Sequence, residues 1–400
     1  MRTIGIIKEG KTPPDRRVPF TPEQCRQLEK QWSGTKVIVE RSDIRCFPDS
    51  AYEDAGLVMS NDISDCDIIM GVKEVPLEKL FAGKIYFFFS HTIKEQPYNR
   101  ELLQTVLNRN ICLVDYETLT DERGLRLLGF GRWAGIVGAY NGLYAWGHKT
   151  GAYTLKRAYK CSSRSEMDAE LEKVTLPPGR IVLTGGGRVA NGAMETLDKA
   201  GIRRVDPDEF LLMESDSPVY CPIDADVYCR HRDGLAFNFS HFFAHPQEYE
   251  SAFAPFTCVA DMHIACHYWD PASPLFYAAE DMARSDFRIR LVADISCDID
   301  GPIASTLRAS SIREPLYGYN PKSGEEAPFE DSSSVGVMAV DNLPCELPKE
   351  ASADFGQTLL EKVMPCLLGE DRGGVIARAC IAADGRLMPA FKYLEGYAGV

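Results

Sequence analysis

The chain has 400 residues, of which 45% are hydrophobic and 26% are charged, and its formal net charge is −14. This length suits two domains of ordinary size, and the composition is that of a globular protein. A chain with this negative charge is not expected to bind nucleic acid or an anionic membrane. Its expected partners are small molecules.

Apolar runs alternate with helical segments in the first part of the chain. Strands are predicted at 2–7, 36–39, 68–70, 85–89 and 111–115, and helices at 22–31, 50–55 and 97–108. The first helix has a start signal, because Thr21 can cap it, Pro22 takes its first position and Gln24 completes a capping box. Strands and helices that alternate with short links predict an α/β domain with a mainly parallel sheet.

Several polar side chains follow these strands at their carboxyl ends, where ligands bind in open α/β sheets. They are Lys73 and Glu74, His91 and Glu117, with Arg17 in the loop before the first helix. Histidine suits proton transfer near neutral pH, and arginine can clamp a carboxylate. Each residue alone would be interpreted as a surface or capping residue, but together they suit hydride transfer at a carbon that bears nitrogen.

The middle of the chain changes character. Residues 131–151 are rich in glycine, alanine and aromatic residues and predict a closely packed helix between two domains. Residues 161–180 are polar and end in Leu-Pro-Pro-Gly, which predicts a loop. Residues 317–334 are polar and rich in turn formers, and predict an exposed hairpin or flap.

A dinucleotide fingerprint begins after the predicted strand at 180–184. The run Gly185-Gly186-Gly187-Arg188-Val189-Ala190 has the form G-x-G-x-x-A and leads into a predicted helix. Gly185 permits the tight turn, Gly187 lets the backbone approach a pyrophosphate, and the small Ala190 allows close packing of helix and strand. The alternative is a tight turn that binds no nucleotide. We assign Arg188 and Val189 to the same cofactor site.

The choice between NAD and NADP depends on the next acidic residue. Asp206 lies 21 residues after Gly185, where a carboxylate would bind the ribose 2′-hydroxyl, and this favours NAD. However, Asp206 could simply cap the next helix, and Arg203 and Arg204 could serve a 2′-phosphate. A further strand is expected over residues 256–266, which would place Thr257 near the cofactor.

No metal site is predicted. The 13 cysteines include no Cys-x-x-Cys pair, and no pair of them has ligands at zinc spacing. Four histidines are expected to be structural: His241, His245, His263 and His267. The start of the chain has no signal-peptide pattern and no apolar run is long enough to cross a bilayer, so a cytoplasmic protein is expected.

A family resemblance adds to this interpretation. The motifs that carry it are DRRVPF (15–20), GVKEVP (71–76), FFSHTIK (88–94), VDYE (114–117), FGRWAG (130–135), APFTC (254–258), ADISCD (293–298) and VDNLP (340–344). Across nearly its whole length the chain resembles the lysine-forming saccharopine dehydrogenases. It is most similar to the lysine–ketoglutarate reductase half of the bifunctional aminoadipic semialdehyde synthases. Alanine dehydrogenase and the transhydrogenase α chain share the architecture.

The resemblance implies roles for the residues at the strand ends. Lys73 would be the base for the secondary amine, and His91 would be the acid–base group for carbinolamine formation and collapse. Glu74 and Glu117 would tune the charge beside them.

The resemblance also implies binding residues. Arg17 and Arg126 would bind substrate carboxylates, and Asp298 would lie near the nicotinamide and the amine. The segment Asp341-Asn342-Leu343 would contact the cofactor.

The implied fold has two Rossmann-like domains with parallel twisted sheets and a cleft between them that holds cofactor and substrate. Residues 1–136 plus 350–400 would form the substrate domain, and residues 137–349 the NAD(P)-binding domain. The expected reaction is the interconversion of saccharopine with lysine and 2-oxoglutarate, by a monomer or homodimer. Two alternatives stay open: a dehydrogenase for another amino acid or opine-type amine, and a catalytically silent nucleotide-binding sensor.

Overall fold

The computed structural model describes residues 2–400, which divide into two compact units. Unit 1 combines the chain up to Phe130 with Pro348–Val400, and unit 2 is Gly131–Leu347. The boundaries expected from the sequence, after residues 136 and 349, lie close to these. None of the helices among the described residues has the length and apolar character needed to cross a membrane.

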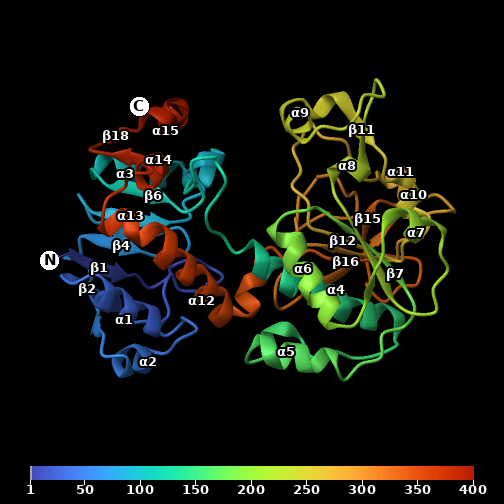
Figure 1. Ribbon diagram of the computed structural model, residues 1–400, viewed down its shortest axis with the longest axis horizontal. Coiled ribbons are helices and arrows are strands. Elements are labelled where there is room, and N and C mark those ends of the chain that lie inside the picture. The colour runs from blue at the N-terminus through green and yellow to red at the C-terminus, as the bar shows by residue number, and fades with distance from the viewer. Residues whose placement is uncertain (1) are drawn as a thin grey trace. The chain divides into compact units, whose positions relative to one another are not determined.

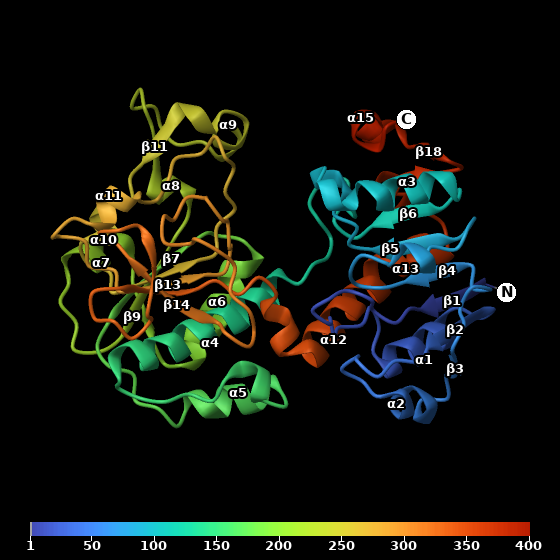
Figure 2. The ribbon, with the colours of Figure 1, turned by 180° about the vertical axis from the view of Figure 1, so that it is seen from behind.

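Unit 1 is built on a sheet of eight strands (Figures 1 and 2). In sheet order the strands are β18 (Arg386–Leu387), β17 (Cys380–Ala383), β6 (Cys112–Asp115), β5 (Ile85–Phe88), β4 (Ile68–Met70), β1 (Arg2–Ile6), β2 (Thr35–Glu40) and β3 (Val58–Ser60). The strands from β6 to β3 run parallel, whereas β17 and β18 are antiparallel additions from the end of the chain.

Helices cover both faces of this sheet. The α-helices of unit 1 are α1 (Pro22–Gln31), α2 (Asp49–Asp54), α3 (Arg100–Asn108), α12 (Pro348–Thr358), α13 (Met364–Leu368), α14 (Val375–Ala379) and α15 (Glu395–Ala398), with a π-helical turn at Leu359–Val363. In β5, Phe87 packs into the core under α1 and α12, while Tyr86 and Phe88 pack into the core under α3. A strand buried on both faces explains the unbroken apolar run that precedes His91. The capping box predicted at Thr21 is present.

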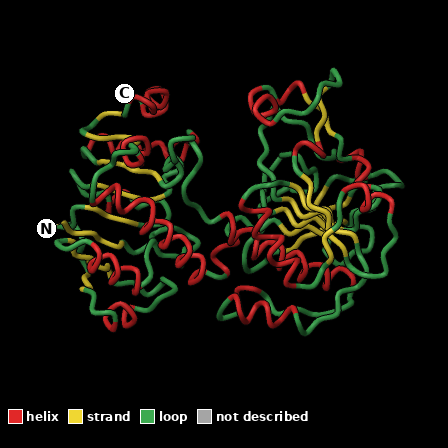
Figure 3. The backbone as a smooth tube through the Cα atoms, in the orientation of Figure 1, coloured by secondary structure: helices red, strands yellow, loops and turns green. Residues whose placement is uncertain are grey.

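Unit 2 holds a second sheet of eight strands, whose twist is visible in Figure 3. In sheet order the strands are β15 (Glu325–Ala327), β14 (Leu316–Asn320), β16 (Val335–Met338), β13 (Leu291–Asp294), β12 (Met262–Ala265), β7 (Arg180–Thr184), β9 (Val219–Ile223) and β8 (Arg203–Arg204). Strands from β16 to β8 are parallel, and β14 and β15 are antiparallel. A separate two-stranded antiparallel sheet pairs β10 (Cys229–His231) with β11 (Tyr249–Ser251).

The helices of unit 2 include the glycine-rich segment that the sequence predicts to be helical. They are α4 (Gly131–Thr150), α5 (Arg164–Leu171), α6 (Arg188–Lys199), α7 (Pro207–Leu212), α8 (Ala225–Tyr228), α9 (Phe239–Ala244), α10 (Ala254–Thr257) and α11 (Ala279–Met282). The backbones of α4 and α6 touch. A Cβ at Gly135 would lie 1.9 Å from the carbonyl oxygen of Val189, and one at Gly192 would lie 2.0 Å from that of Arg132. Glycine is therefore needed at both positions.

Three sequence predictions for unit 2 need correction. The predicted loop at 161–180 contains α5, because Ser163 caps a short helix that buries Met167 and Leu171. The segment 317–334 does form a hairpin, but its strand β14 is an inner strand of the sheet with buried Tyr317 and Tyr319, and only β15 lies at the edge. The strand expected over residues 256–266 spans only Met262–Ala265, because Ala254–Thr257 forms the short helix α10.

Candidate active site

The carboxyl ends of four adjacent parallel strands of unit 1 gather the predicted catalytic residues. Strands β6, β5, β4 and β1 are neighbours in this order. Glu117 follows β6, His91 follows β5, and Lys73 and Glu74 follow β4. Arg17 lies in the loop after β1. The local sequence predicts the strand ends, and the parallel order brings them to one edge of the sheet.

Lys73 is held through its backbone by the buried carboxyl group of Glu9. Glu9 accepts the Val72 N–H at 2.6 Å and the Lys73 N–H at 2.9 Å. Burial lowers the pKa of the Lys73 ammonium, and the positive charges of Arg17 and Lys11 lower it further. A lysine with a lowered pKa sheds its proton more readily near neutral pH, so this side chain can act as a base.

Glu9 itself has an unusually high pKa. Burial raises its pKa to about 8, the negative charge of Asp15 adds to the rise, and the two backbone hydrogen bonds only partly offset it. Glu9 was missed at the sequence level. The signal that could have found it is its position two residues after the predicted strand at 2–7, the same criterion that identified Lys73 and His91.

His91 and Glu74 form a hydrogen-bonded pair. The Nδ1 of His91 lies 2.6 Å from Oε1 of Glu74, and the ammonium of Lys11 lies 3.1 Å from Oε2 of the same carboxylate. Burial would raise the pKa of Glu74, but the hydrogen bond from His91 and the charges of His91 and Lys11 outweigh it and lower the pKa to about 2. An ionised Glu74 holds the ring proton on Nδ1, which leaves Nε2 of His91 free to exchange a proton with a ligand.

The backbone at His91 is also constrained. His91 has a φ of 53°, in the left-handed region that few non-glycine residues adopt. The preceding Ser90 is buried, and its N–H donates to Oδ2 of Asp115 at 2.8 Å, while the N–H of Glu117 donates to Oδ1 at 2.7 Å. Asp115, also missed at the sequence level, therefore ties the end of β5 to the end of β6 and holds the backbone directly before His91.

The two predicted carboxylate-binding arginines differ in their surroundings. Arg17 is buried, pairs with Asp15 through Nη2 at 2.6 Å, and lies over the ring of Phe130. Arg126 is partly exposed and lies 3.6 Å from Oε1 of Glu117. Arg126 is thus more accessible to a ligand than Arg17. Carboxylate binding by either arginine stays a prediction.

In unit 2, the residues of the fingerprint fit a dinucleotide. Gly185 has a φ of 109°, and a Cβ there would lie 2.6 Å from the carbonyl oxygen of Cys266, so the turn needs glycine. A Cβ at Gly187 would meet no atom within 4 Å, which leaves room for a ligand. Gly187 is also the N-cap of α6 and offers no side chain to its first N–H groups. The N–H groups at a helix start are a binding site for phosphate.

The remaining predicted cofactor residues fall into two groups. Asp298 follows β13 and the segment 341–343 follows β16, so both lie at the same carboxyl edge as the glycine-rich turn. Thr257 precedes β12, at the opposite, amino end of that strand, because it belongs to α10. The sequence interpretation of Thr257 rested on a longer strand, and the structure does not bring it to the turn.

The acidic residues near the fingerprint are arranged in an unexpected way. Asp206 is exposed and caps α7, its Oδ1 accepting the Glu209 N–H at 2.8 Å. Its strand β8 lies at the sheet edge, and β9 separates it from β7. Asp224 follows β9, and a Cβ on Gly186 would lie 2.0 Å from its Oδ2. The carboxylate beside the turn is therefore that of Asp224, which sequence spacing does not single out.

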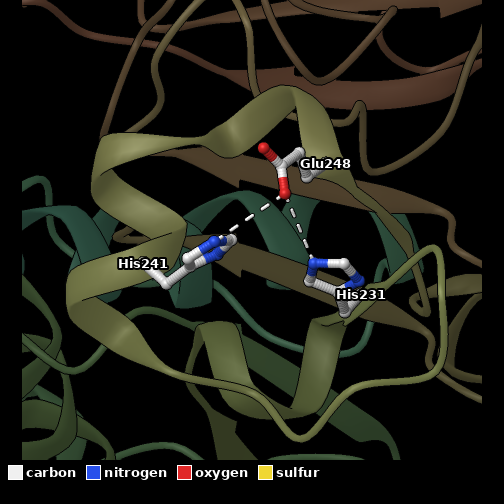
Figure 4. A group of neighbouring side chains, drawn as sticks. All are labelled: His231, His241 and Glu248. Atoms are coloured by element: carbon white, nitrogen blue, oxygen red, sulfur yellow. Dashed lines mark ion pairs between the residues drawn. The ribbon is translucent and has the colours of Figure 1, made fainter.

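A second cluster of titratable side chains surrounds Glu248, far from the fingerprint in the sequence (Figure 4). Oε2 of Glu248 lies 3.5 Å from Nε2 of His231 and 3.7 Å from Nε2 of His241. The N–H of Asp233 donates to Nδ1 of His231 at 3.1 Å, so the ring proton of a neutral His231 is on Nε2. In this tautomer Nε2 carries a proton and has no hydrogen-bond partner among the described residues, so it offers no lone pair to a metal ion.

Known proteins resemble this chain over most of its length. Residues 5–137 match the family model described as "Alanine dehydrogenase/PNT, N-terminal domain". The alpha-aminoadipic semialdehyde synthase of Arabidopsis thaliana is 31% identical over 98% of this chain and 41% of its own length. The mitochondrial protein of that name from Mus musculus is 30% identical over 98% of this chain and 47% of its own length. The chain thus spans less than half the length of these relatives.

Other relatives match over most of their length. The NAD(+), L-lysine-forming saccharopine dehydrogenase of Neurospora crassa is 26% identical over 88% of this chain and 87% of its own length. Among solved structures, an L-alanine dehydrogenase superposes with a TM-score of 0.67 at 18% identity, covering 98% of this chain and 99% of that one. This structural likeness concerns the fold.

Proposed function

The chain belongs to the family of the lysine-forming saccharopine dehydrogenases and aminoadipic semialdehyde synthases, and on this basis we propose that it interconverts saccharopine with L-lysine and 2-oxoglutarate. It would be an oxidoreductase that acts on a carbon–nitrogen bond with a nicotinamide cofactor. The observation that carries the proposal is the gathering of Lys73 with the Glu74–His91 pair at the carboxyl ends of two adjacent strands.

His91 is proposed to move protons while the carbon–nitrogen bond forms. The ε-amine of lysine attacks the ketone of 2-oxoglutarate, and the adduct must gain a proton on oxygen and lose water to become an imine. Nε2 of His91 is available for these transfers, because Nδ1 is committed to Glu74. A histidine oriented by a carboxylate suits both directions of proton transfer.

Lys73 is proposed to serve the secondary amine. In the oxidative direction the amine of saccharopine must lose a proton before the carbon beside it gives up hydride. Burial and two nearby cations lower the pKa of Lys73, which favours its neutral, basic form. Glu9 holds the backbone of Lys73 through the amide hydrogen bonds and so positions the base.

The remaining predicted residues are proposed to bind the substrate and the cofactor. Arg126 would contact a substrate carboxylate, Arg17 would do so from within its pair with Asp15, and Glu117 would set the charge beside Arg126. The cofactor supplies the hydride acceptor when bound. The N–H groups at the start of α6 would hold its pyrophosphate, with Asp298 and residues 341–343 at the same edge of the sheet.

The test is a spectrophotometric assay at a wavelength where only reduced nicotinamide absorbs. Purified protein is given lysine and 2-oxoglutarate with NADH or NADPH, beside Lys73→Met and His91→Gln variants. Lys30→Met, an exposed lysine on α1, is the matched control. The expected result is oxidation that needs both substrates, is unaffected by the control change and falls by at least about a hundredfold in either site variant.

The other outcomes separate the alternatives. Turnover only with another amino acid or keto acid would replace the substrate and keep the dehydrogenase. Dinucleotide binding with no turnover in either direction would contradict the enzyme and favour a nucleotide-binding sensor.

A further inference from the structure

We propose that Asp224 sets the cofactor preference, by accepting a hydrogen bond from the adenosine ribose 2′-hydroxyl, so that the chain binds NAD(H) in preference to NADP(H). This inference rests on the proposed function, because it presumes a dinucleotide at the glycine-rich turn.

The first step is the order of the strands. In a doubly wound sheet, the acidic residue that binds the ribose follows the strand beside the fingerprint strand. The neighbour of β7 on that side is β9, paired from Arg180 with Val219 to Thr184 with Ile223. Asp224 is therefore level with Gly185, the first residue of the turn.

The second step is the contact with the turn. A Cβ built on Gly186 would lie only 2.0 Å from the Oδ2 of Asp224, so the carboxylate packs directly against the turn. The Oδ1 accepts the Ala225 N–H at 2.8 Å and caps α8. Among residues 2–400, Oδ2 has no hydrogen-bond partner, so Asp224 keeps one acceptor for a ligand.

The third step is the chemistry that this acceptor selects. A carboxylate accepts hydrogen bonds from hydroxyl groups and repels a phosphate at the same place. A ribose with a free 2′-hydroxyl is therefore favoured over one with a 2′-phosphate.

The competing residues are placed less well. Asp206 is one strand further from β7, and its Oδ1 already accepts the Glu209 N–H that caps α7. Arg203, a candidate for a 2′-phosphate, is paired with Glu209 at 2.8 Å. The usual spacing rule selects Asp206 because it assumes that the first strand after the fingerprint helix is also the neighbour of the fingerprint strand.

The experiment is isothermal titration of the purified chain with NADH and with NADPH, without substrates. It compares the wild type with Asp224→Asn, Asp224→Ser and the control Asp206→Asn. Asparagine can still cap α8, so Asp224→Asn is expected to fold, which circular dichroism and a thermal melt check. The wild type should bind NADH at least about tenfold more tightly than NADPH.

The Asp224 variants should lose about ten- to a hundredfold in NADH affinity and gain affinity for NADPH, while Asp206→Asn keeps the wild-type ratio. A folded Asp224→Asn that binds NADH and keeps the wild-type ratio overturns this inference alone. So does a wild type that prefers NADPH, or a ratio that changes with Asp206 instead. A wild type that binds neither dinucleotide overturns the proposed function beneath it.

Discussion

Neutralising Glu74 tests the electrostatics of the candidate site most directly. The pKa of Glu74 is lowered from an ordinary 4.5 to about 2, and its side chain is 13% exposed. A difference of this size corresponds to about 3 kcal/mol of stability at neutral pH. Because the pKa is lower in the folded chain, this contribution is complete above pH 4.5 and is lost as the pH falls toward 2. Glu74→Gln should therefore lower the free energy of unfolding by about 2–3 kcal/mol at pH 7.

The pH dependence of the unfolding free energy distinguishes the contribution of the Glu74 charge from that of its packing. By the same relation, the difference between wild type and Glu74→Gln should be about 1 kcal/mol smaller at pH 3.5 than at pH 7. The assay is urea unfolding at pH 7, 5 and 3.5, with Glu23→Gln on the exposed face of α1 as the matched control. A loss of equal size at every pH, or no loss at pH 7, would refute the pairing of an ionised Glu74 with His91 and Lys11.

Three further predictions concern other parts of the fold. Glu9 has a pKa raised to about 8, so its contribution to stability is largest below pH 4.5 and declines as the pH rises toward 8. In urea unfolding between pH 5 and 8.5, Glu9→Gln should remove that decline. An unchanged dependence of the unfolding free energy on pH would contradict this prediction. Gly185→Ala should lower the melting temperature and abolish NADH binding in calorimetry, whereas Gly187→Ala, in open space, should weaken binding without changing the melt. Gly135→Ala should cost about 2 kcal/mol or more in urea unfolding, because its methyl group meets the Val189 carbonyl, and a neutral result would mean that α4 and α6 can separate freely.

Local sequence determined much of what positions the candidate site. The start of α1 is specified by Thr21, Pro22 and Gln24, and both sides of the capping box form as predicted. The run that ends at Phe89 specifies a strand buried on both faces, and a polar residue after such a strand must lie at its end. His91 and Lys73 could therefore be placed at strand ends without knowledge of the fold. Periodicity and turn chemistry are short-range properties, and they are readable from a few neighbouring residues.

Other features depend on contacts between distant segments. The 161–180 segment is polar, yet it contains α5, because Met167 and Leu171 find apolar neighbours that the local pattern does not reveal. Tyr317 and Tyr319 are buried because β14 pairs with β16 on one side and β15 on the other. The same limit explains Glu9, whose importance comes from amide groups more than sixty residues away.

The acidic residue beside the glycine-rich turn shows the division most clearly. The sequence alone determined the turn itself, since only glycine at Gly185 can adopt its φ of 109° against the Cys266 carbonyl. It could not determine which strand lies next to β7, because β8 and β9 are both short strands of suitable pattern and follow one another in the chain. The strand order is decided by pairing between whole strands, which places β9 next to β7 and β8 at the edge of the sheet. Only the tertiary structure therefore brought Asp224, rather than Asp206, to the turn.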